Sequence, residues 1–124
     1  MRAGEGHGGC DLVPDNILID GATTRVIDFD DCGWSWPGFE MATSLFPLQV
    51  SGGFDAGMEA YLEGYRQVRP FPQRDLEIFP DLLMARALSY LGGPVGRPEI
   101  ASARSLIPMF ACMVTEAARQ YLES

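Results

Sequence analysis

The stretch Asp11-Leu12-Val13-Pro14-Asp15-Asn16-Ile17-Leu18-Ile19-Asp20 is separated by five residues from a second stretch, Val26-Ile27-Asp28-Phe29-Asp30. Residues 17–19 and 25–29 are short runs rich in β-branched side chains, and residues 20–23 between them supply turn chemistry. This arrangement predicts a β-hairpin with a turn of four to six residues. Such a hairpin would bring Asn16 and the region of Asp28 side by side.

Three polar residues around the predicted hairpin suit one kind of chemistry. Pro14 stiffens the loop between Asp11 and Asn16, so a carboxylate and an amide can face one point. Asn16 and Asp28 offer oxygen ligands of the kind that Mg²⁺ prefers, and Mg²⁺ takes few protein ligands beside phosphate oxygens. Asp11 would then orient a substrate hydroxyl and accept its proton. Phosphoryl transfer from ATP requires such a trio, whereas the alternative is that these residues only cap a loop.

The motifs resemble those of the aminoglycoside phosphotransferase and choline kinase family. That family carries His-Gly-Asp, four residues, Asn, a hairpin, and then Ile-Asp-Phe followed by an acidic residue. The chain has Gly9-Cys10-Asp11, then Asn16, then Ile27-Asp28-Phe29-Asp30. The only histidine, His7, lies four residues before Asp11, whereas the family histidine lies two residues before its aspartate.

The resemblance implies a kinase-like site and an activity. Asp11 would be the catalytic aspartate, and Asn16 and Asp28 would bind both the magnesium ion and the phosphates of ATP. Asp30 is a further candidate metal ligand, with a solvated loop residue as the alternative. The implied reaction is transfer of the γ-phosphate of ATP to a hydroxyl group of a small molecule.

The rest of the chain predicts helices. Phe39, Ala42, Leu45 and Phe46 share one face of a helix over residues 38–48, with Pro47 near its end. A second helix begins at Phe54 and ends before Pro70. A third is predicted over residues 73–91, ended by Gly92-Gly93-Pro94, and a fourth over residues 98–122, kinked or split at Pro108.

The predicted fold class is therefore α+β, mostly α, in a single domain. Residues 1–37 would carry the catalytic and metal loops with the hairpin, and residues 38–124 would form a helical, substrate-binding subdomain of four helices. Residues 1–9 are Gly-rich and polar, which favours a loop. By the resemblance, the whole chain corresponds to the C-terminal lobe of the kinase, and no segment resembling the nucleotide-binding N-terminal lobe precedes the motif.

Composition excludes several classes of partner. The 124 residues carry a net charge of −8, which argues against nucleic acid and anionic membranes. All basic residues are arginines, so no lysine is available for a phosphate. Three widely spaced cysteines form no disulfide framework, and no apolar run reaches membrane length, so we expect a cytoplasmic protein.

Other metal sites are less well supported by the spacing. Asp28 and Asp30 resemble the start of a calcium-binding EF-hand loop, but Phe39 stands where that loop needs glutamate. Zinc would have to use His7, Cys10 and Cys32, which lack paired spacing.

Three further groups of side chains leave alternatives open. Trp34 and Trp36 either stack on a substrate ring or, as we favour, cover the hairpin and the first helix. Arg86 is expected to pair with a carboxylate, with substrate binding as the alternative. Acidic residues suit a cationic substrate or a solvated helix face; they include Glu59, Glu63 and Asp75.

The alternative to a kinase is a non-catalytic module. A lobe without its nucleotide-binding partner would be weakly active and would expose apolar surface, which favours a homodimer or docking onto a separately encoded N-terminal lobe. A truncated remnant of such a kinase is the third alternative.

Overall fold

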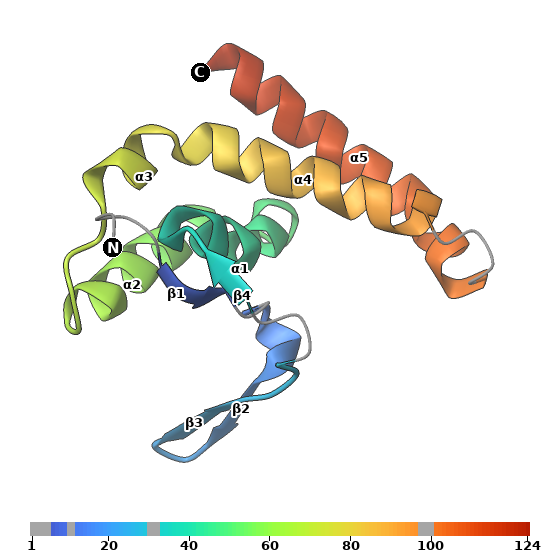
Figure 1. Cartoon of the computed structure of the whole chain (residues 1–124). Coiled ribbons are helices and arrows are strands. Elements are labelled where there is room, and N and C mark those ends of the chain that lie inside the picture. The colour runs from blue at the N-terminus through green and yellow to red at the C-terminus, as the bar shows by residue number, and fades with distance from the viewer. Residues whose placement is uncertain (1–5, 10–11, 30–32, 97–100) are drawn as a thin grey trace.

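The structure is a computed structural model that describes residues 6–9, 12–29, 33–96 and 101–124. The chain forms mostly helices with two small antiparallel strand pairs, which confirms the prediction of an α+β, mostly α fold (Figure 1). The elements, in chain order, are β1 (Gly6–Gly9), the 3-10 helix η1 (Pro14–Asn16), β2 (Ile17–Asp20), β3 (Thr23–Val26), β4 (Gly33–Ser35), α1 (Pro37–Ser51), α2 (Phe54–Arg66), α3 (Gln73–Glu77), α4 (Phe79–Gly96) and α5 (Ala101–Glu123).

The predicted hairpin forms from β2 and β3, in the register Ile17 to Val26 through Asp20 to Thr23. Its turn has two residues rather than four to six, because Gly21 adopts φ +59°, which suits the tightest hairpin turns. The second strand ends at Val26, so Asp28 lies just outside the ladder instead of within the strand. The hairpin projects away from the helices (Figure 1), and none of its strand residues is buried.

A second strand pair was not predicted. Residues 6–9, expected to be loop, form β1 and pair antiparallel with β4, with Gly6 opposite Ser35 and Gly9 opposite Gly33. β1 has the sequence Gly-His-Gly-Gly, so it has almost no side-chain pattern for a strand. Its pairing depends on main-chain partners in a segment more than 20 residues away, which local patterns cannot reveal.

The first two helices match their predicted positions. α1 begins with Pro37 in its first turn, where the missing N–H costs nothing, and it continues through Pro47 to Ser51 rather than ending at residue 48. α2 begins at Phe54, as predicted. The turn between them uses Gly52 and Gly53, whose φ angles of +87° and +85° are open to glycine but strained for other residues.

The third and fourth predicted helices need correction. A break at Ile78 divides the predicted 73–91 helix into α3 and α4, so the described residues form five α-helices instead of the predicted four. Pro80 explains the break, because proline lacks the N–H for a helical bond and its ring crowds the preceding turn. Gly92-Gly93-Pro94 does not end the helix, since α4 continues to Gly96. α5 is not split at Pro108.

The hydrophobic core lies between α1, α4 and α5. Met41, Ala42 and Phe46 of α1 have 1% exposure or less, and Ala87 of α4 is fully buried. α4 and α5 run antiparallel and cover one side of α1, while α2 packs on its other side (Figure 1). No helix of the described residues is long and apolar enough to span a membrane.

Candidate functional site

The base of the hairpin brings two of the predicted site residues together. The main-chain N–H of Ile27 donates a 2.9 Å hydrogen bond to the carbonyl oxygen of Asn16, which extends the β2–β3 ladder by one step. Asn16 is therefore opposite Ile27, and Asp28 is the next residue along the chain. The Asn16 N–H in turn donates to the Val13 carbonyl at 2.9 Å, closing the single turn of η1. Main-chain hydrogen bonds thus fix Asn16 on both of its sides.

Asp28 has an unusual backbone conformation. Its φ of 63° makes it the only non-glycine residue with positive φ in the described part of the chain. Aspartate and asparagine tolerate this region better than other side chains, but it still costs free energy. Strained backbone of this kind gathers at functional positions, and the Asp28 side chain is exposed to solvent.

The segment that leads into η1 is held by α1. The main-chain N–H of Leu12 donates a 3.0 Å hydrogen bond to Glu40 Oε1, in the first turn of α1. Leu12 directly follows Asp11, so this bond fixes the chain next to the predicted catalytic aspartate. Asp11 itself and the candidate ligand Asp30 lie outside the described residues. One signal for this role of Glu40 was visible in the sequence: an acidic residue at the start of a predicted helix.

Tyr61 of α2 extends this polar cluster into the helical layer. Burial is the main cause of a raised pKa at the Tyr61 hydroxyl, and the carboxylate of Glu40 adds to it. The phenol therefore stays protonated well above neutral pH and is available as a hydrogen-bond donor. The sequence pattern indicated that Tyr61 lies on the apolar face of a helix, but it did not indicate a contact with Glu40.

The donor set at the hairpin base fits a magnesium ion. Asn16 and Asp28 supply one amide oxygen and one carboxylate, and an ion of this type needs only one or two such protein ligands beside phosphate oxygens. Among the described residues, no three His, Cys, Asp or Glu side chains lie close enough together to hold a metal ion. Neither a zinc nor a calcium cluster is therefore found in this part of the chain. The positions of Cys10 and Cys32 are outside those residues.

The acidic residues predicted for a cationic substrate lie elsewhere. Asp75 is fully buried, and its Oδ2 accepts a 2.8 Å hydrogen bond from the Gly38 N–H at the start of α1. Glu59 and Glu63 are exposed on α2 and line a shallow hollow of that helix. Asp75 is thus a structural residue, and the α2 carboxylates form a solvated helix face.

The two tryptophans and Arg86 also have defined surroundings. Trp34 is 75% exposed, which does not fit the expected covering role. The Arg74 guanidinium lies over the Trp36 ring, 5.5 Å from the centre of that ring. The Arg86 guanidinium lies over the Tyr90 ring at 4.4 Å and over the Phe39 ring at 5.9 Å. These aromatic contacts were not predicted for Arg86.

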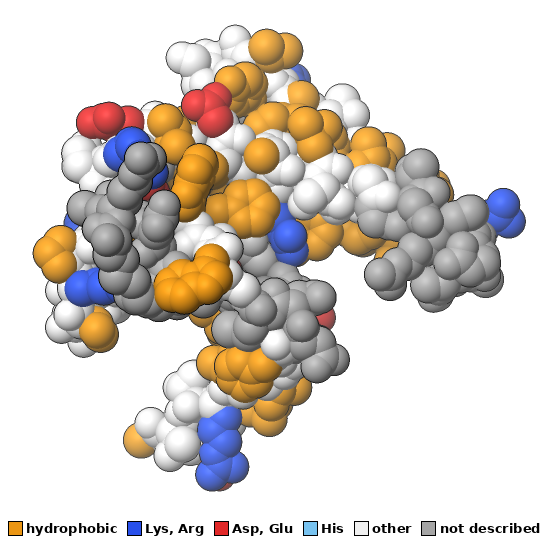
Figure 2. Space-filling view, viewed as in Figure 1, with side chains coloured by type: hydrophobic (Ala, Val, Ile, Leu, Met, Phe, Trp, Pro, Cys, Tyr) orange, Lys and Arg blue, Asp and Glu red, His pale blue; other side chains and the backbone are white. Residues whose placement is uncertain are grey.

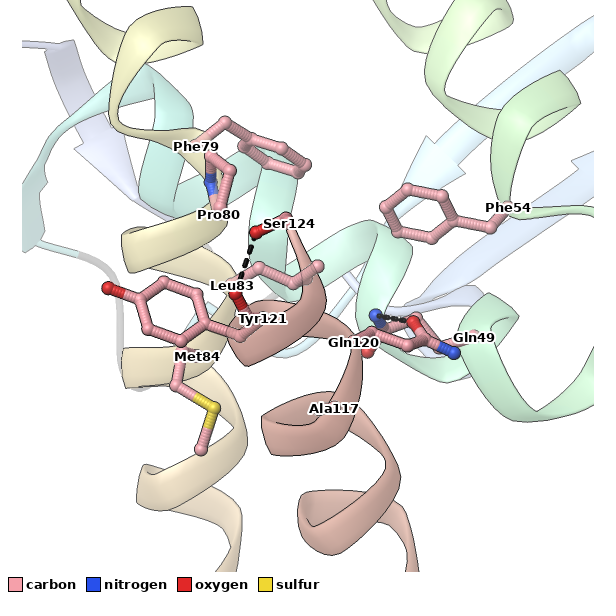
Figure 3. A pocket seen from close by; sticks show the side chains of 10 residues that line it. All are labelled: Gln49, Phe54, Phe79, Pro80, Leu83, Met84, Ala117, Gln120, Tyr121 and Ser124. Carbon is pink, nitrogen blue, oxygen red and sulfur yellow. Dashed lines mark hydrogen bonds between the residues drawn. The ribbon is translucent and has the colours of Figure 1, made fainter.

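Two apolar cavities open on the helical body. One, of about 250 Å³, lies between the end of α1, the start of α4 and the end of α5, where Leu83, Met84 and Tyr121 form its walls (Figure 3). The other, of about 410 Å³, lies beside η1 and includes Val13, Pro14 and Asp15 in its lining. Only the second is next to the predicted catalytic loop.

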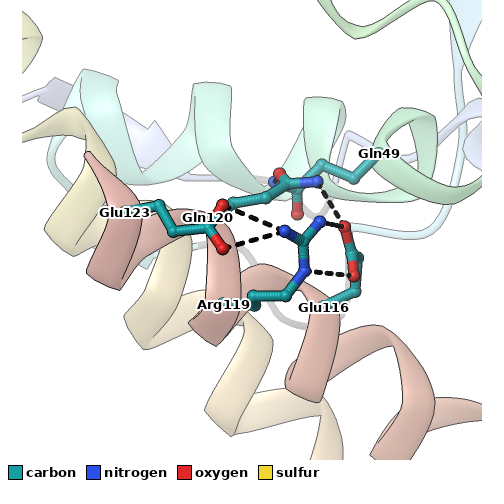
Figure 4. A network of polar contacts seen from close by, with 5 residues as sticks. All are labelled: Gln49, Glu116, Arg119, Gln120 and Glu123. Carbon is teal, nitrogen blue, oxygen red and sulfur yellow. Dashed lines mark hydrogen bonds and ion pairs between the residues drawn. The ribbon is translucent and has the colours of Figure 1, made fainter.

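The first cavity is bordered by a polar network that links α1 to α5 (Figure 4). Gln49 Nε2 donates to Gln120 Oε1 at 3.3 Å, and Gln120 Nε2 donates to Glu116 Oε1 at 2.9 Å. Arg119 bridges Glu116 and Glu123 along the same helix. These exposed ion pairs contribute little stability, so the network marks a surface rather than a reaction centre.

Comparison with protein families gives one match. The phosphotransferase enzyme family matches residues 10–71, which is half of the 124-residue chain and includes the η1 loop, the hairpin, α1 and α2. The chain belongs to this family of phosphotransferases, which confirms the resemblance found in the sequence. Comparison with curated proteins gave no match, and comparison with solved structures gave none either.

Proposed function

We propose that the chain forms the catalytic and metal-binding part of an ATP-dependent kinase with a kinase-like fold, which transfers the γ-phosphate to a hydroxyl group of a small molecule. The hydrogen bond from Ile27 to Asn16 is the observation that carries the proposal, because it pairs Asn16 with the residue directly before Asp28. Family membership supports phosphoryl transfer as the reaction class.

Each residue has a distinct role in this proposal. Asp11 orients the acceptor hydroxyl and takes its proton, a role that requires a carboxylate within reach of the substrate. Asn16 and Asp28 hold the magnesium ion with the ATP phosphates, and Asp30 is a further ligand. The ion, when bound, offsets the negative charge of the phosphates. Glu40 acts through Leu12 and fixes the loop that bears Asp11.

Two isosteric substitutions test these roles. Asp28→Asn should abolish binding of Mg²⁺ with ADP in a calorimetric titration, because it removes the only charged ligand of the described pair. Asp11→Asn should leave that binding intact and remove turnover. Asp20→Asn is the matched control, since Asp20 is also exposed and lies at the far end of the hairpin. Equal, small effects of all three substitutions would contradict the proposal.

We also propose a docking surface for a nucleotide-binding lobe on the hairpin. Apolar side chains are exposed along the hairpin and just beyond it, namely Leu18, Ile19, Ile27 and Phe29. The same region of the space-filling view is rich in hydrophobic atoms (Figure 2). Such a patch favours contact with protein. Because side chains alternate along a strand, Leu18 and Ile27 share the face of the ladder that carries Asn16, so a lobe docked on that face would lie next to the proposed phosphate site.

Sedimentation analysis tests the docking surface. Leu18→Lys alters an apolar residue on the face of Asn16, 50% exposed, and should weaken association with a nucleotide-binding lobe added in trans. Concentration-dependent self-association that Leu18→Lys removes would instead indicate a homodimer. We further propose a cytoplasmic location, in keeping with the use of ATP and with the free, exposed thiol of Cys112.

A further inference from the structure

The cavity beside the catalytic loop has the size of a ligand site. Its volume of about 410 Å³ lies within the range typical for pockets that hold small molecules. One wall is Val13, Pro14 and Asp15, the residues directly before Asn16. A molecule in this cavity would therefore contact the loop that leads to the proposed metal ligand.

The opposite wall is aromatic and rigid. Tyr90 of α4 stacks on Phe46 of α1, with ring centres 5.1 Å apart, and on Phe110 of α5, with ring centres 5.6 Å apart. Both pairs are nearly parallel, at 17° between ring planes. Phe46 is 1% exposed, so the core fixes one end of this stack. A wall that is ordered before binding loses little entropy when a ligand arrives.

The rest of the lining is also apolar. Met109 and Met113 of α5 border the cavity, and methionine adapts its shape to apolar surfaces, including aromatic rings. Among the described lining residues, Asp15 alone has a formal charge, and it is exposed. A polycationic molecule would meet one carboxylate here and a large apolar wall, so it would lose hydration without compensation.

We propose that this cavity receives an aromatic or alicyclic ring of the acceptor alcohol. This inference rests on the proposed function, and it selects an apolar small-molecule alcohol over a polycationic aminosugar as the substrate class. The ring would pack against the wall of Phe46, Tyr90 and Phe110, while the hydroxyl group would lie on the Val13–Asp15 side of the cavity, which leads to Asn16.

Methionine methyl groups report occupation of the cavity directly. Phenethyl alcohol is titrated into the chain carrying isotope-labelled methionine methyls, and their NMR signals are followed. We expect Met109 and Met113 to shift with one common saturation curve. Met84 lines the other apolar cavity, so a shift of Met84 alone would overturn the inference. Streptamine, a polycationic alcohol, should cause no such shift, and stronger binding of streptamine at Met109 would also overturn it.

A matched pair of variants tests the location. Met109→Glu places a charge in the cavity, whereas Leu88→Glu places the same charge on α4 outside it. The two residues are 49% and 53% exposed, so both substitutions should preserve the fold to a similar degree. Met109→Glu should weaken phenethyl alcohol binding about tenfold or more, a loss of about 1.4 kcal/mol, and Leu88→Glu should leave it within about twofold. Equal effects of the two variants would refute the assignment.

A separate titration distinguishes this inference from the proposed function. The proposed function expects Mg²⁺ with ADP to bind at Asn16 and Asp28, so Asp28→Asn should remove that binding and leave the shifts of Met109 and Met113 unchanged. Failure of nucleotide binding with intact alcohol binding would refute the kinase proposal alone. Intact nucleotide binding without shifts at Met109 and Met113 would refute the substrate class alone.

Discussion

Leu12 and Glu40 are joined by a hydrogen bond across 28 residues of sequence: the Leu12 N–H donates to Glu40 Oε1 at 3.0 Å. The bond connects the loop before η1 to the first turn of α1, which is part of the helical core. A charged acceptor makes such a bond stronger than one between neutral groups. Glu40 thus couples the loop that begins at Leu12, directly after the proposed catalytic aspartate in sequence, to the packing of the helices.

Loss of the Glu40 carboxylate should loosen this loop. Glu40→Ala leaves the Leu12 N–H without its acceptor and should lower the free energy of unfolding by about 1–3 kcal/mol in urea titrations. Hydrogen exchange at the Leu12 amide should accelerate. Glu59→Ala, on the exposed face of α2, serves as the control and should change stability by less than about 0.5 kcal/mol. Unchanged exchange at Leu12 in Glu40→Ala would contradict the coupling.

Alkaline pH should destabilise the chain through Tyr61. Burial first, and the Glu40 charge second, raise the pKa of Tyr61 in the folded state above its ordinary value of 10.0. Above pH 10 the unfolded state therefore loses a proton that the folded state keeps. The contribution of Tyr61 to the free energy of unfolding is fully present below pH 10 and decreases as the pH rises above 10. The slope should approach about 1.4 kcal/mol per pH unit for one proton.

Denaturant titrations between pH 9 and 12, with the phenolate absorbance as a second probe, measure this effect. Tyr61→Phe should reduce the slope, and Glu40→Ala should lower the pKa of Tyr61 relative to wild type. A Tyr61 phenol that ionises at its ordinary pH in the folded chain would exclude this account.

Two glycines in helices should respond to alanine in opposite ways. A Cβ at Gly38 would lie 2.7 Å from Leu82 Cδ1 and 2.9 Å from Asp75 Cβ, so Gly38→Ala must displace buried atoms and should cost about 1–3 kcal/mol. A Cβ at Gly64 meets nothing within 4 Å. Gly64→Ala should therefore raise stability by about 0.5–1 kcal/mol, the ordinary gain of alanine in a helix. Thermal unfolding of both variants measures the difference, and a shift of the same sign in both would oppose this reasoning.

Asp28 should combine a stability cost with a binding role. Its φ of 63° strains a residue with a side chain, so Asp28→Gly should leave stability unchanged or raise it by up to about 1 kcal/mol. The same substitution should abolish binding of Mg²⁺ with ADP. Asp20→Gly, at the end of β2, should instead lower stability and preserve binding, because a strand residue loses order. A strongly destabilised Asp28→Gly variant would disprove the strain.

The parts of the fold that were predicted are those set by local sequence. The hairpin follows from two β-branched runs around Gly21, and the start of α2 follows from the apolar period that begins at Phe54. The pairing of Asn16 with the Asp28 region was predicted for the same reason, since a hairpin fixes which residues are opposite each other.

The parts that were not predicted depend on distant partners. β1 has almost no side chains to form a pattern, and it pairs with β4 through its main chain. Gly92-Gly93-Pro94 would end an isolated helix, but α4 passes through it while packing along α5. Asp75 looked like a surface acid in sequence, yet it is buried because Gly38 lets α3 approach the start of α1.

The projecting hairpin has a consequence for how the chain unfolds. No residue of β2 or β3 is buried, so the pairing of Asn16 with Ile27, the residue before Asp28, depends on ladder hydrogen bonds and not on the core. We therefore expect the hairpin to open at a lower free energy than the helical body. Phosphates bound at Asn16 and Asp28 would stabilise the closed hairpin. A bound ligand would therefore raise the free energy of hairpin opening toward that of the helical body.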